Sequence, residues 1–253
     1  MITVIDCETT GTDAAVDRVV EFAAVPIHVI EAAPGSDLRP VYSIGEGLSS
    51  LVYPGIPIPP QASAVYHLID EDVESAPPLG RAINQVLGPL WQSDENLICC
   101  AHNARFDRSF LPPLQNAKWL DTYRCAMHLF PDAPTHSNQG LRYALRLPVP
   151  RDLPVHRALG DCVVTAHLLL RLLQERSLDE LLTLSRKAVV LKTISFGKHK
   201  GMAWTDDEDS VAAIFSNPGQ RTVLKLHGRI RLRNPIVNAV SNTAPMLAKH
   251  TSV

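Results

Sequence analysis

The chain has 253 residues, of which 45% are hydrophobic and 20% are charged. This composition excludes a disordered or low-complexity chain, because it supplies enough apolar side chains for a packed core. The first residues, MITVIDCE, lack the basic and then apolar pattern of a signal peptide, and no apolar run reaches the roughly 18 residues that a membrane span needs. We therefore expect a soluble cytoplasmic protein that has no membrane partner.

Charge is distributed unevenly along the chain. The net charge is −2, which argues neither for nor against nucleic acid, but residues 185–253 hold 11 Lys or Arg against 4 Asp or Glu. A basic segment behind an acidic body fits a phosphate-binding tail that follows a metal-requiring site. Ordinary solvated surface charge explains the same distribution equally well. Because the hydrophobic pattern also changes near residue 188, the sequence predicts a domain at 1–188 and a small basic module at 189–253.

The first part of the chain has the pattern of a β-hairpin followed by helices. Residues 2–7 and 19–30 are apolar runs rich in β-branched residues, and the turn segment TTGTD follows the first of them. The short gap predicts that these two strands pair antiparallel. Another strand is expected at 47–53, before the segment PGIPIPP. Residues 61–69 and 81–91 carry apolar side chains at helical spacing.

The second part of the chain alternates strand-like and helical segments. Residues 96–101, NLICCA, form a continuous apolar run of the kind found in buried parallel strands. A helix is expected over 102–111, with Asn103 and Asp107 four residues apart on one face. The strongest helical pattern is the second half of residues 147–176. Further elements are a strand at 118–122 and helices at 123–130, 140–147 and 177–188.

The five cysteines show no C-x-x-C spacing and lie in apolar or helical stretches. They are Cys7, Cys99, Cys100, Cys125 and Cys162. We expect reduced, mostly buried thiols, so the sequence predicts neither a zinc site nor a disulfide framework.

Two carboxylates, Asp6 and Glu8, stand at the end of the first strand. Side chains alternate between the faces of a strand, so these two point to one side while Ile5 and Cys7 point to the other. Adjacent carboxylates repel unless a cation neutralises them, and oxygen ligands suit hard ions such as Mg²⁺ or Mn²⁺. A D-x-E pair alone is more often an ordinary surface feature. The metal interpretation therefore depends on partners elsewhere in the chain.

Two further acids, Asp107 and Asp161, come from other elements. Asp107 follows the buried strand at 96–101, and Asp161 lies on the long helix, five residues after His156. Each of the four acids, taken alone, is better explained as a helix cap or a surface charge. That explanation weakens when a strand, a buried strand and an amphipathic helix each carry an acid next to apolar sequence.

The acids and His156 lie in three short motifs, DCETTG, AHNARFD and HRALGD. Together these resemble the three signature blocks of the DEDDh 3′-to-5′ exonucleases, with every acid and the histidine at a matching place over residues 1–175. The segments VVEFAAV, QASAVYHL and WLDTYRCA also resemble landmarks of this family. The resemblance implies an α/β domain of the ribonuclease-H-like type, with a mixed five-stranded sheet flanked by helices.

The resemblance also implies two divalent metal ions, Mg²⁺ or Mn²⁺, which clamp the attacking and leaving oxygens of a phosphodiester. Asp6 would bridge both ions, and Glu8 and Asp161 would hold the ion that activates water. Asp107 would help to hold the second ion. His156 would take the proton from the attacking water, a task that suits a side chain titrating near neutral pH.

Substrate contacts carried over from the family are expected around the metal ligands. The backbone of Thr9, Thr10 and Gly11 would contact the terminal 3′ nucleotide, and Gly11 would allow the turn there. Stacking on an aromatic side chain tolerates any base. Core packing explains Phe106 and Tyr66 equally well. Contacts with the substrate strand are expected from Tyr66, His67, Asn103 and Phe106.

The implied activity is metal-dependent release of 5′-mononucleotides from 3′ ends, with single-stranded or frayed DNA as the substrate. The alternatives are an RNA-directed exonuclease of the same family, a polymerase proofreading subunit and a catalytically silent nucleic-acid-binding module. A silent module would have no need of five titratable groups at these positions. The sequence predicts no oligomeric state.

The tail segment TISFGKHKGMAW resembles the C-terminal module of the exodeoxyribonuclease X branch of the family. Basic side chains in the tail could track the backbone of a longer DNA, which would make the affinity sensitive to salt. The alternative is that the FGKHKG turn only packs a small β-containing unit onto the body. The basic side chains concerned are Lys198, His199, Lys200, Arg229, Arg231 and Arg233.

Overall fold

The computed structural model describes residues 1–30, 40–90, 97–189, 223–226 and 229–232. The chain divides into two compact units, Met1–Lys187 and Ala188–Val253. Within the described residues, no helix has both the length and the apolar character that crossing a membrane requires. The first unit holds the sheet and all the helices described below.

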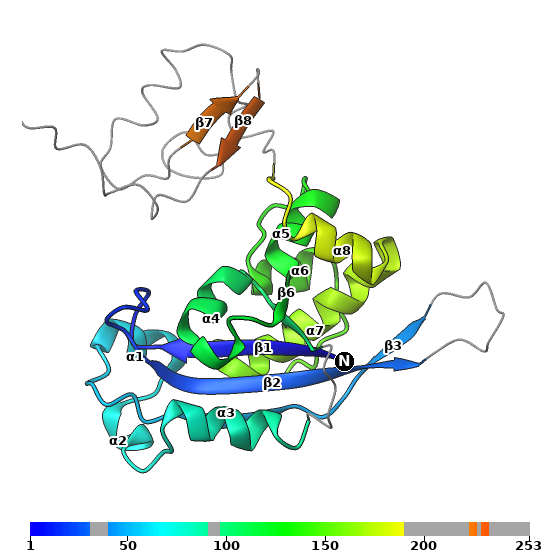
Figure 1. Cartoon of the computed structure of the whole chain (residues 1–253). Helices are drawn as coiled ribbons and strands as arrows, with labels where there is room; N and C mark the ends of the chain where they lie inside the picture. Colours follow the sequence, from blue (N-terminus) through cyan, green and yellow to red (C-terminus); the bar gives the residue numbers. More distant parts are fainter. Residues whose placement is uncertain (31–39, 91–96, 190–222, 227–228, 233–253) are drawn as a thin grey trace, which may run out of the picture. The chain divides into compact units, whose positions relative to one another are not determined.

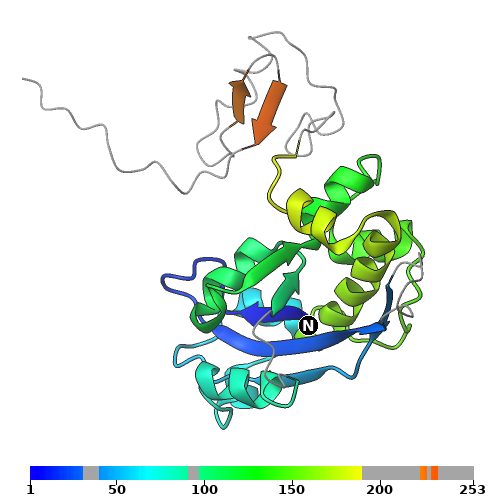
Figure 2. The same ribbon diagram turned by 45° about the vertical axis from the view of Figure 1, so that its right-hand side comes forward.

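Strand β1 (Ile2–Thr9) lies inside a mixed sheet of six strands. It pairs antiparallel with the long strand β2 (Val19–Ile30) and parallel with β5 (Ile98–Ala101), which in turn pairs parallel with β6 (Lys118–Asp121). Figures 1 and 2 show β1 and β2 side by side through the middle of this unit. The predicted hairpin and the buried parallel strand are therefore confirmed.

The sheet has one strand more than the five that were predicted. Strands β3 (Val41–Ile44) and β4 (Leu48–Leu51) both pair antiparallel with β2, because its 12 residues are long enough to receive them one after the other. The strand predicted at 47–53 corresponds to β4. Strand β3 was missed because its residues form a strand by pairing with the far end of β2, which no local pattern records.

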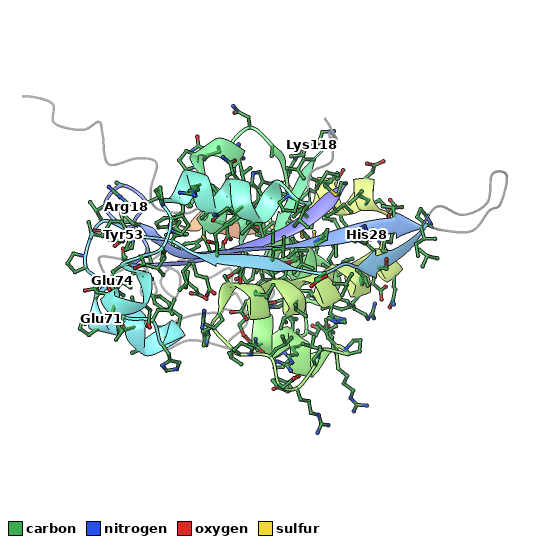
Figure 3. All side chains as sticks on the ribbon, turned by 90° about the horizontal axis from the view of Figure 1, so that it is seen from below. Arg18, His28, Tyr53, Glu71, Glu74 and Lys118 are labelled. Carbon is green, nitrogen blue, oxygen red and sulfur yellow. The ribbon has the colours of Figure 1, made fainter. Side chains whose placement is uncertain are left out.

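Helices cover both faces of the sheet. The strands cross the middle of Figure 3, with α3 (cyan) on one side and α7 (yellow-green) on the other. The α7 face also receives α5, α6 and α8, and the α3 face also receives α4. The bounds are α3 (Leu79–Leu87), α4 (Ala104–Phe110), α5 (Thr122–Leu129), α6 (Asn138–Ala144), α7 (Ala158–Glu175) and α8 (Leu178–Leu184).

The alternation of side chains along β1 determines which of its residues face α7. Ile2 and Val4 belong to the core cluster on the α7 face, whereas Ile5 and Cys7 belong to the cluster on the α3 face. Even-numbered positions of β1 therefore face α7, and the next even positions are those of the two acids. The long helix is bonded to this face, because the thiol of Cys162 contacts the Val4 and Ala23 carbonyl oxygens.

Two short helices, α1 (Pro60–Tyr66) and α2 (Asp70–Val73), lie near the end of β1. Helix α1 starts at a proline, whose fixed φ suits the first helical position, and ends at His67 in the left-handed conformation. Both helices contribute to a small third core cluster with Val20 and Ile58. The turn η1 (Pro112–Leu114) follows α4.

All five cysteines are buried and free, as the sequence predicted. In the second unit, β7 (Val223–Leu226) pairs antiparallel with β8 (Arg229–Leu232). The other tail predictions, including the segment TISFGKHKGMAW and its basic residues, lie outside the described residues. The function of the tail stays a prediction.

Candidate active site at the end of strand β1

Three carboxylates converge between the end of β1 and the first turn of α7. Each of Asp6, Glu8 and Asp161 offers one oxygen, and these three oxygens all lie within 4.8 Å of one another. Asp6 and Glu8 continue the row of β1 that faces α7, and Asp161 lies in the first helical turn, where the helix dipole favours a negative charge. All three side chains are half-buried, so they remain open to a small ligand.

Crowding and burial make this cluster unfavourable in its fully charged form. Burial raises the pKa of Asp6 well above its usual value, and the charges of Asp107, Glu8 and Asp161 raise it further. Burial, followed by the charge of Asp161, raises the pKa of Glu8 to about 7. These raised pKa values show that the negative charges are unfavourable together, so a bound cation would compensate several of them at once.

Asp107 lies next to this cluster but is not one of the three. It projects from α4, is 3% exposed, and its Oδ1 accepts hydrogen bonds from the Cys7 amide at 3.2 Å and the Cys7 thiol at 3.5 Å. Burial raises the pKa of Asp107 to about 7, and the two bonds from Cys7 oppose that rise. Cys7, the residue between Asp6 and Glu8 in the sequence, thus holds the Asp107 carboxylate in place.

The start of α4 differs from the prediction. Asn103 has φ 74°, a left-handed conformation that asparagine tolerates better than most residues, and the helix begins only at Ala104. The expectation that Asn103 and Asp107 share one helical face is therefore wrong. Instead, the amide of Asn103 donates to Oδ1 of Asp121 at 3.2 Å, and its side chain is exposed.

His156 lies in the loop immediately before α7. It has φ 55° and is exposed. Its backbone hydrogen bond and its charge both act on Asp161, where they oppose the rise in pKa that burial causes. The loop fits closely against the helix, because a Cβ added at Gly160 would collide with the carbonyl oxygen of Pro154. The structure thus places His156 beside the cluster with its imidazole open to solvent.

The segment after β1 is held by its own side chains. Thr10 is 3% exposed, and its hydroxyl donates to Asp17 at 3.1 Å and accepts from the Arg18 amide at 3.0 Å. The Thr10 amide also donates to the Arg18 carbonyl oxygen at 2.8 Å, so Arg18, labelled in Figure 3, lies opposite Thr10 where the segment returns to the sheet. Gly11 is needed here for space rather than for a positive φ, because an added Cβ would collide with the Asp17 carboxylate. Thr9 is buried, and its hydroxyl donates to the Gly11 carbonyl at 2.5 Å.

The predicted aromatic contacts are packed into the fold. Tyr66 is 2% exposed, and its hydroxyl has no hydrogen-bond partner among the described residues. Burial raises the pKa of Tyr66 to about 12, with Glu8 adding to the shift. Phe106 is half-buried against Phe110, with ring centroids 5.0 Å apart, whereas His67 is exposed. Tyr66 therefore packs in the core while its polar end lies near the acids.

The family model described as Exonuclease matches residues 3–169 of this chain. The chain belongs to the exonuclease family. It is 31% identical over 210 residues to Exodeoxyribonuclease 10 of Escherichia coli (strain K12), which covers 81% of this chain and 84% of that protein. It is 28% identical over 179 residues to DNA polymerase III subunit epsilon of Treponema pallidum (strain Nichols), covering 66% of this chain and 73% of the other.

A solved structure, Exonuclease X in complex with 5′ overhanging duplex DNA, has the same fold as this exonuclease. The match has a TM-score of 0.56 and 30% identity, and it covers 73% of this chain and 99% of the other. The mixed sheet with flanking helices is therefore the ribonuclease-H-like fold that the motifs predicted.

The donor set of this exonuclease fits a divalent metal ion. The exonuclease family depends on divalent metals, and the three residues whose ligand atoms converge are all carboxylates. Hard oxygen donors suit Mg²⁺ or Mn²⁺ better than zinc, which prefers histidine and thiolate. The thiol of Cys7, the residue between Asp6 and Glu8, is bonded to Asp107 and has a pKa that burial raises well above its usual value.

Sequence reasoning missed an ion pair beside the cluster. Glu21, which is 3% exposed, lies opposite Glu8 in the β1–β2 register and takes two hydrogen bonds, at 2.8 and 2.9 Å, from the guanidinium of Arg157. The amide of Ala158 also donates to Glu21. The pair links the start of α7 to the sheet. Only the β1–β2 register, which puts Glu21 opposite Glu8, could have indicated it from the sequence.

Sequence reasoning also missed Gln139, whose side chain donates to Asp161 from α6. No spacing rule links these positions, because the packing of α6 against α7 brings them together. His102 is a structural residue: its ring nitrogens contact the Thr122 hydroxyl and the His136 carbonyl oxygen, and burial lowers its pKa to about 4.

Proposed function

We propose that the chain is a 3′-to-5′ exodeoxyribonuclease that hydrolyses the terminal phosphodiester and releases 5′-mononucleotides. The observation that carries this proposal is the convergence of the carboxylates of Asp6, Glu8 and Asp161 within a domain of the exonuclease family. Asp107 acts on the pKa of Asp6 and His156 acts on that of Asp161, which supports assigning both residues to the same site.

In this proposal two divalent ions, Mg²⁺ or Mn²⁺, are held by the four acids. When bound, they would polarise the phosphodiester and lower the pKa of a water molecule. Asp6, Glu8 and Asp161 offer converging oxygens for this purpose. Both hydrogen bonds from Cys7 go to Oδ1 of Asp107, so Oδ2 is the oxygen that Asp107 would offer to an ion. Cys7 therefore holds the carboxylate of Asp107 in place beside the cluster.

His156 is proposed as the general base. A histidine can accept a proton near neutral pH, and this one lies beside Asp161 with an exposed ring that an incoming water can reach. The proton of the attacking water would pass to a ring nitrogen of His156. The left-handed backbone at this residue fixes where the ring leaves the loop.

The proposed substrate is the 3′ end of single-stranded or frayed DNA. A related solved structure at 30% identity contains duplex DNA with a 5′ overhang, which supports a DNA substrate here. The bonded segment Thr9–Gly11 follows the metal ligands directly and would present its backbone to the terminal nucleotide. The Tyr66 hydroxyl is buried near Glu8 and has no partner in the described part of the chain, so it could accept a hydrogen bond from the same nucleotide or donate one to it.

The experiment that tests the function uses labelled single-stranded DNA, duplex DNA and RNA, each with a free or blocked 3′ end, in Mg²⁺ or in EDTA. We expect a ladder of DNA products shortened from the free 3′ end, and none in EDTA or on blocked ends. Shortening of RNA alone would indicate an RNA-directed exonuclease. Binding without any cleavage would indicate a silent nucleic-acid-binding module and would overturn the proposal.

We also propose that the basic segment at 189–253 strengthens DNA binding. The support is its excess of positive charge, with 11 Lys or Arg against 4 Asp or Glu over residues 185–253. Deleting residues 189–253 should weaken DNA binding and reduce the dependence of the affinity on salt. Identical binding curves for the deletion variant and the full chain would return the tail to a structural role.

A further inference from the structure

Two amide side chains of helix α6 donate hydrogen bonds to Asp161. The side-chain nitrogen of Asn138 donates to the backbone oxygen of Asp161 at 3.1 Å, and Nε2 of Gln139 donates to its Oδ1 at 2.9 Å. Ser137 caps this short helix by accepting from the Gly140 amide, which fixes the positions that follow it. The Gln139 contact is made to Oδ1 of Asp161, and the backbone of His156 also hydrogen-bonds to this carboxylate.

Arg142 fixes the orientation of the Gln139 amide. Its Nη1 donates to Oε1 of Gln139 at 3.3 Å, and its Nη2 donates to the Pro150 carbonyl oxygen at 2.7 Å. A guanidinium has only donors, so the amide must turn its oxygen to Arg142 and its nitrogen to Asp161. The hydrogen-bond network therefore sets the direction of the Gln139 side chain.

The positive charge of Arg142 is buried beside an acidic cluster. Arg142 is 6% exposed, and within the described part of the chain it has no carboxylate at ion-pair distance. Its hydrogen bonds go to neutral oxygens, one of which belongs to Gln139. Burial raises the pKa of Asp161, and the Gln139 hydrogen bond and the Arg142 charge both oppose that rise. Arg142 therefore acts on Asp161 mainly through Gln139, because the direct effect of its charge on Asp161 is smaller than that of the Gln139 hydrogen bond.

We propose that Gln139 and Arg142 are positioning residues that orient the Asp161 carboxylate for metal binding. By holding Oδ1 of Asp161, Gln139 would keep this carboxylate in the orientation in which it converges with Asp6 and Glu8, and Arg142 would keep Gln139 in the orientation that makes this possible. This inference rests on the proposed function, because it assigns the two residues to the metal site of that exonuclease.

The test measures Mn²⁺ binding to the full chain without DNA, by the electron paramagnetic resonance signal of free Mn²⁺. Gln139→Met removes the amide at nearly constant length and should weaken Mn²⁺ binding about tenfold or more, the usual effect of losing such a partner. Arg142→Met should weaken binding in the same direction. Because Arg142 acts through Gln139, the double variant should bind no more weakly than Gln139→Met.

A matched control separates this role from a general effect of the substitution. Gln85 is an exposed glutamine on α3, outside the acidic cluster, and Gln85→Met should bind Mn²⁺ as the wild type does. Thermal melting in EDTA reports folding for every variant. If Arg142→Met fails to fold, Arg142→Lys replaces it, because lysine keeps the charge without the forked donor and should still weaken Mn²⁺ binding.

Three results would overturn the proposal. Equal Mn²⁺ affinity in the wild type and folded Gln139→Met would show that α6 only packs against α7. Additive losses in the double variant would show that Arg142 does not act through Gln139. A wild type that neither binds Mn²⁺ nor shortens DNA would remove the proposed function together with this inference, whereas an active wild type with either of the first two results would remove the inference alone.

Discussion

The two halves of the α7-facing row of β1 have the same backbone geometry and opposite chemistry. Ile2 and Val4 are buried in the core beneath α7. Asp6 and Glu8 continue the same row on the same face, but here the helix contributes Asp161 instead of leucines. One strand and one helix therefore supply both a rigid anchor and a reactive site. The comparison shows that the acids are positioned by the apolar residues that precede them.

The largest expected effect comes from removing an acid in the second half of the row. Asp6→Ala should reduce 3′-end shortening to the background rate, because it deletes one of the three converging oxygen donors of the cluster. The same variant should be at least as stable as the wild type in EDTA, since a half-buried carboxylate repelled by neighbouring acids disappears. A labelled-DNA assay and urea unfolding measure the two effects, and full activity would disprove the metal assignment.

The second effect concerns the base that comes from outside the strand. His156→Ala should slow hydrolysis by about 10²- to 10⁴-fold, the usual contribution of a general base. Mn²⁺ and DNA binding should stay nearly unchanged, because His156 is exposed and is not one of the converging carboxylates. Single-turnover kinetics with saturating enzyme measure the rate constant. An unchanged rate constant would remove His156 from the mechanism.

The third effect tests the apolar half of the row. Val4→Ala removes two methyl groups from a fully buried side chain and should lower the free energy of unfolding by roughly 2 kcal/mol. At temperatures where the variant stays folded, its rate of DNA shortening should lie within about twofold of the wild-type rate. This change is small beside the slowing expected when the general base is removed. Urea unfolding gives the stability. A large loss of activity in the folded variant would mean that the two halves are not separable.

The smallest effect is a dependence of stability on pH in the metal-free protein. Burial raises the pKa of Glu8 from 4.5 and of Asp107 from 3.8 to about 7, so the folded state binds more protons than the unfolded state between these limits. Stability in EDTA should therefore fall as the pH rises from about 4.5 to 7.

Urea midpoints at several pH values in EDTA measure this slope. Glu8→Gln should flatten it, because glutamine does not titrate, whereas Val4→Ala should shift the whole curve without changing its slope. Adding Mg²⁺ at pH 7.5 should raise the midpoint of the wild type more than that of Glu8→Gln. A slope of the opposite sign would contradict the crowded-acid description of the site.

The sequence was sufficient for the parts of the fold and site that follow local periodicity or a motif. The alternation along β1 placed Asp6 and Glu8 on one face, and the pattern of the long helix contained Asp161. The motifs, and not spacing, indicated that Asp107 and His156 belong to the same site. A family resemblance carries tertiary information that periodicity lacks.

The missed features depend on contacts between elements distant in the chain. Strand β3 exists because β2 is long enough to pair with it, and Asn103 leaves the helical conformation to bond to Asp121. The Glu21–Arg157 pair depends on the β1–β2 register, and Gln139 reaches Asp161 only through helix packing. Such contacts are invisible in any single window of sequence.

The close fit at Gly160 has a practical consequence. The Pro154 carbonyl rests where a side chain at position 160 would stand, so a single added methyl group would push away the loop that carries His156. The acidic residues of β1 would not be touched by that change. Gly160→Ala is therefore expected to give a protein that still binds metal and DNA but hydrolyses DNA slowly. Such a variant is needed to crystallise the enzyme in complex with an intact DNA strand.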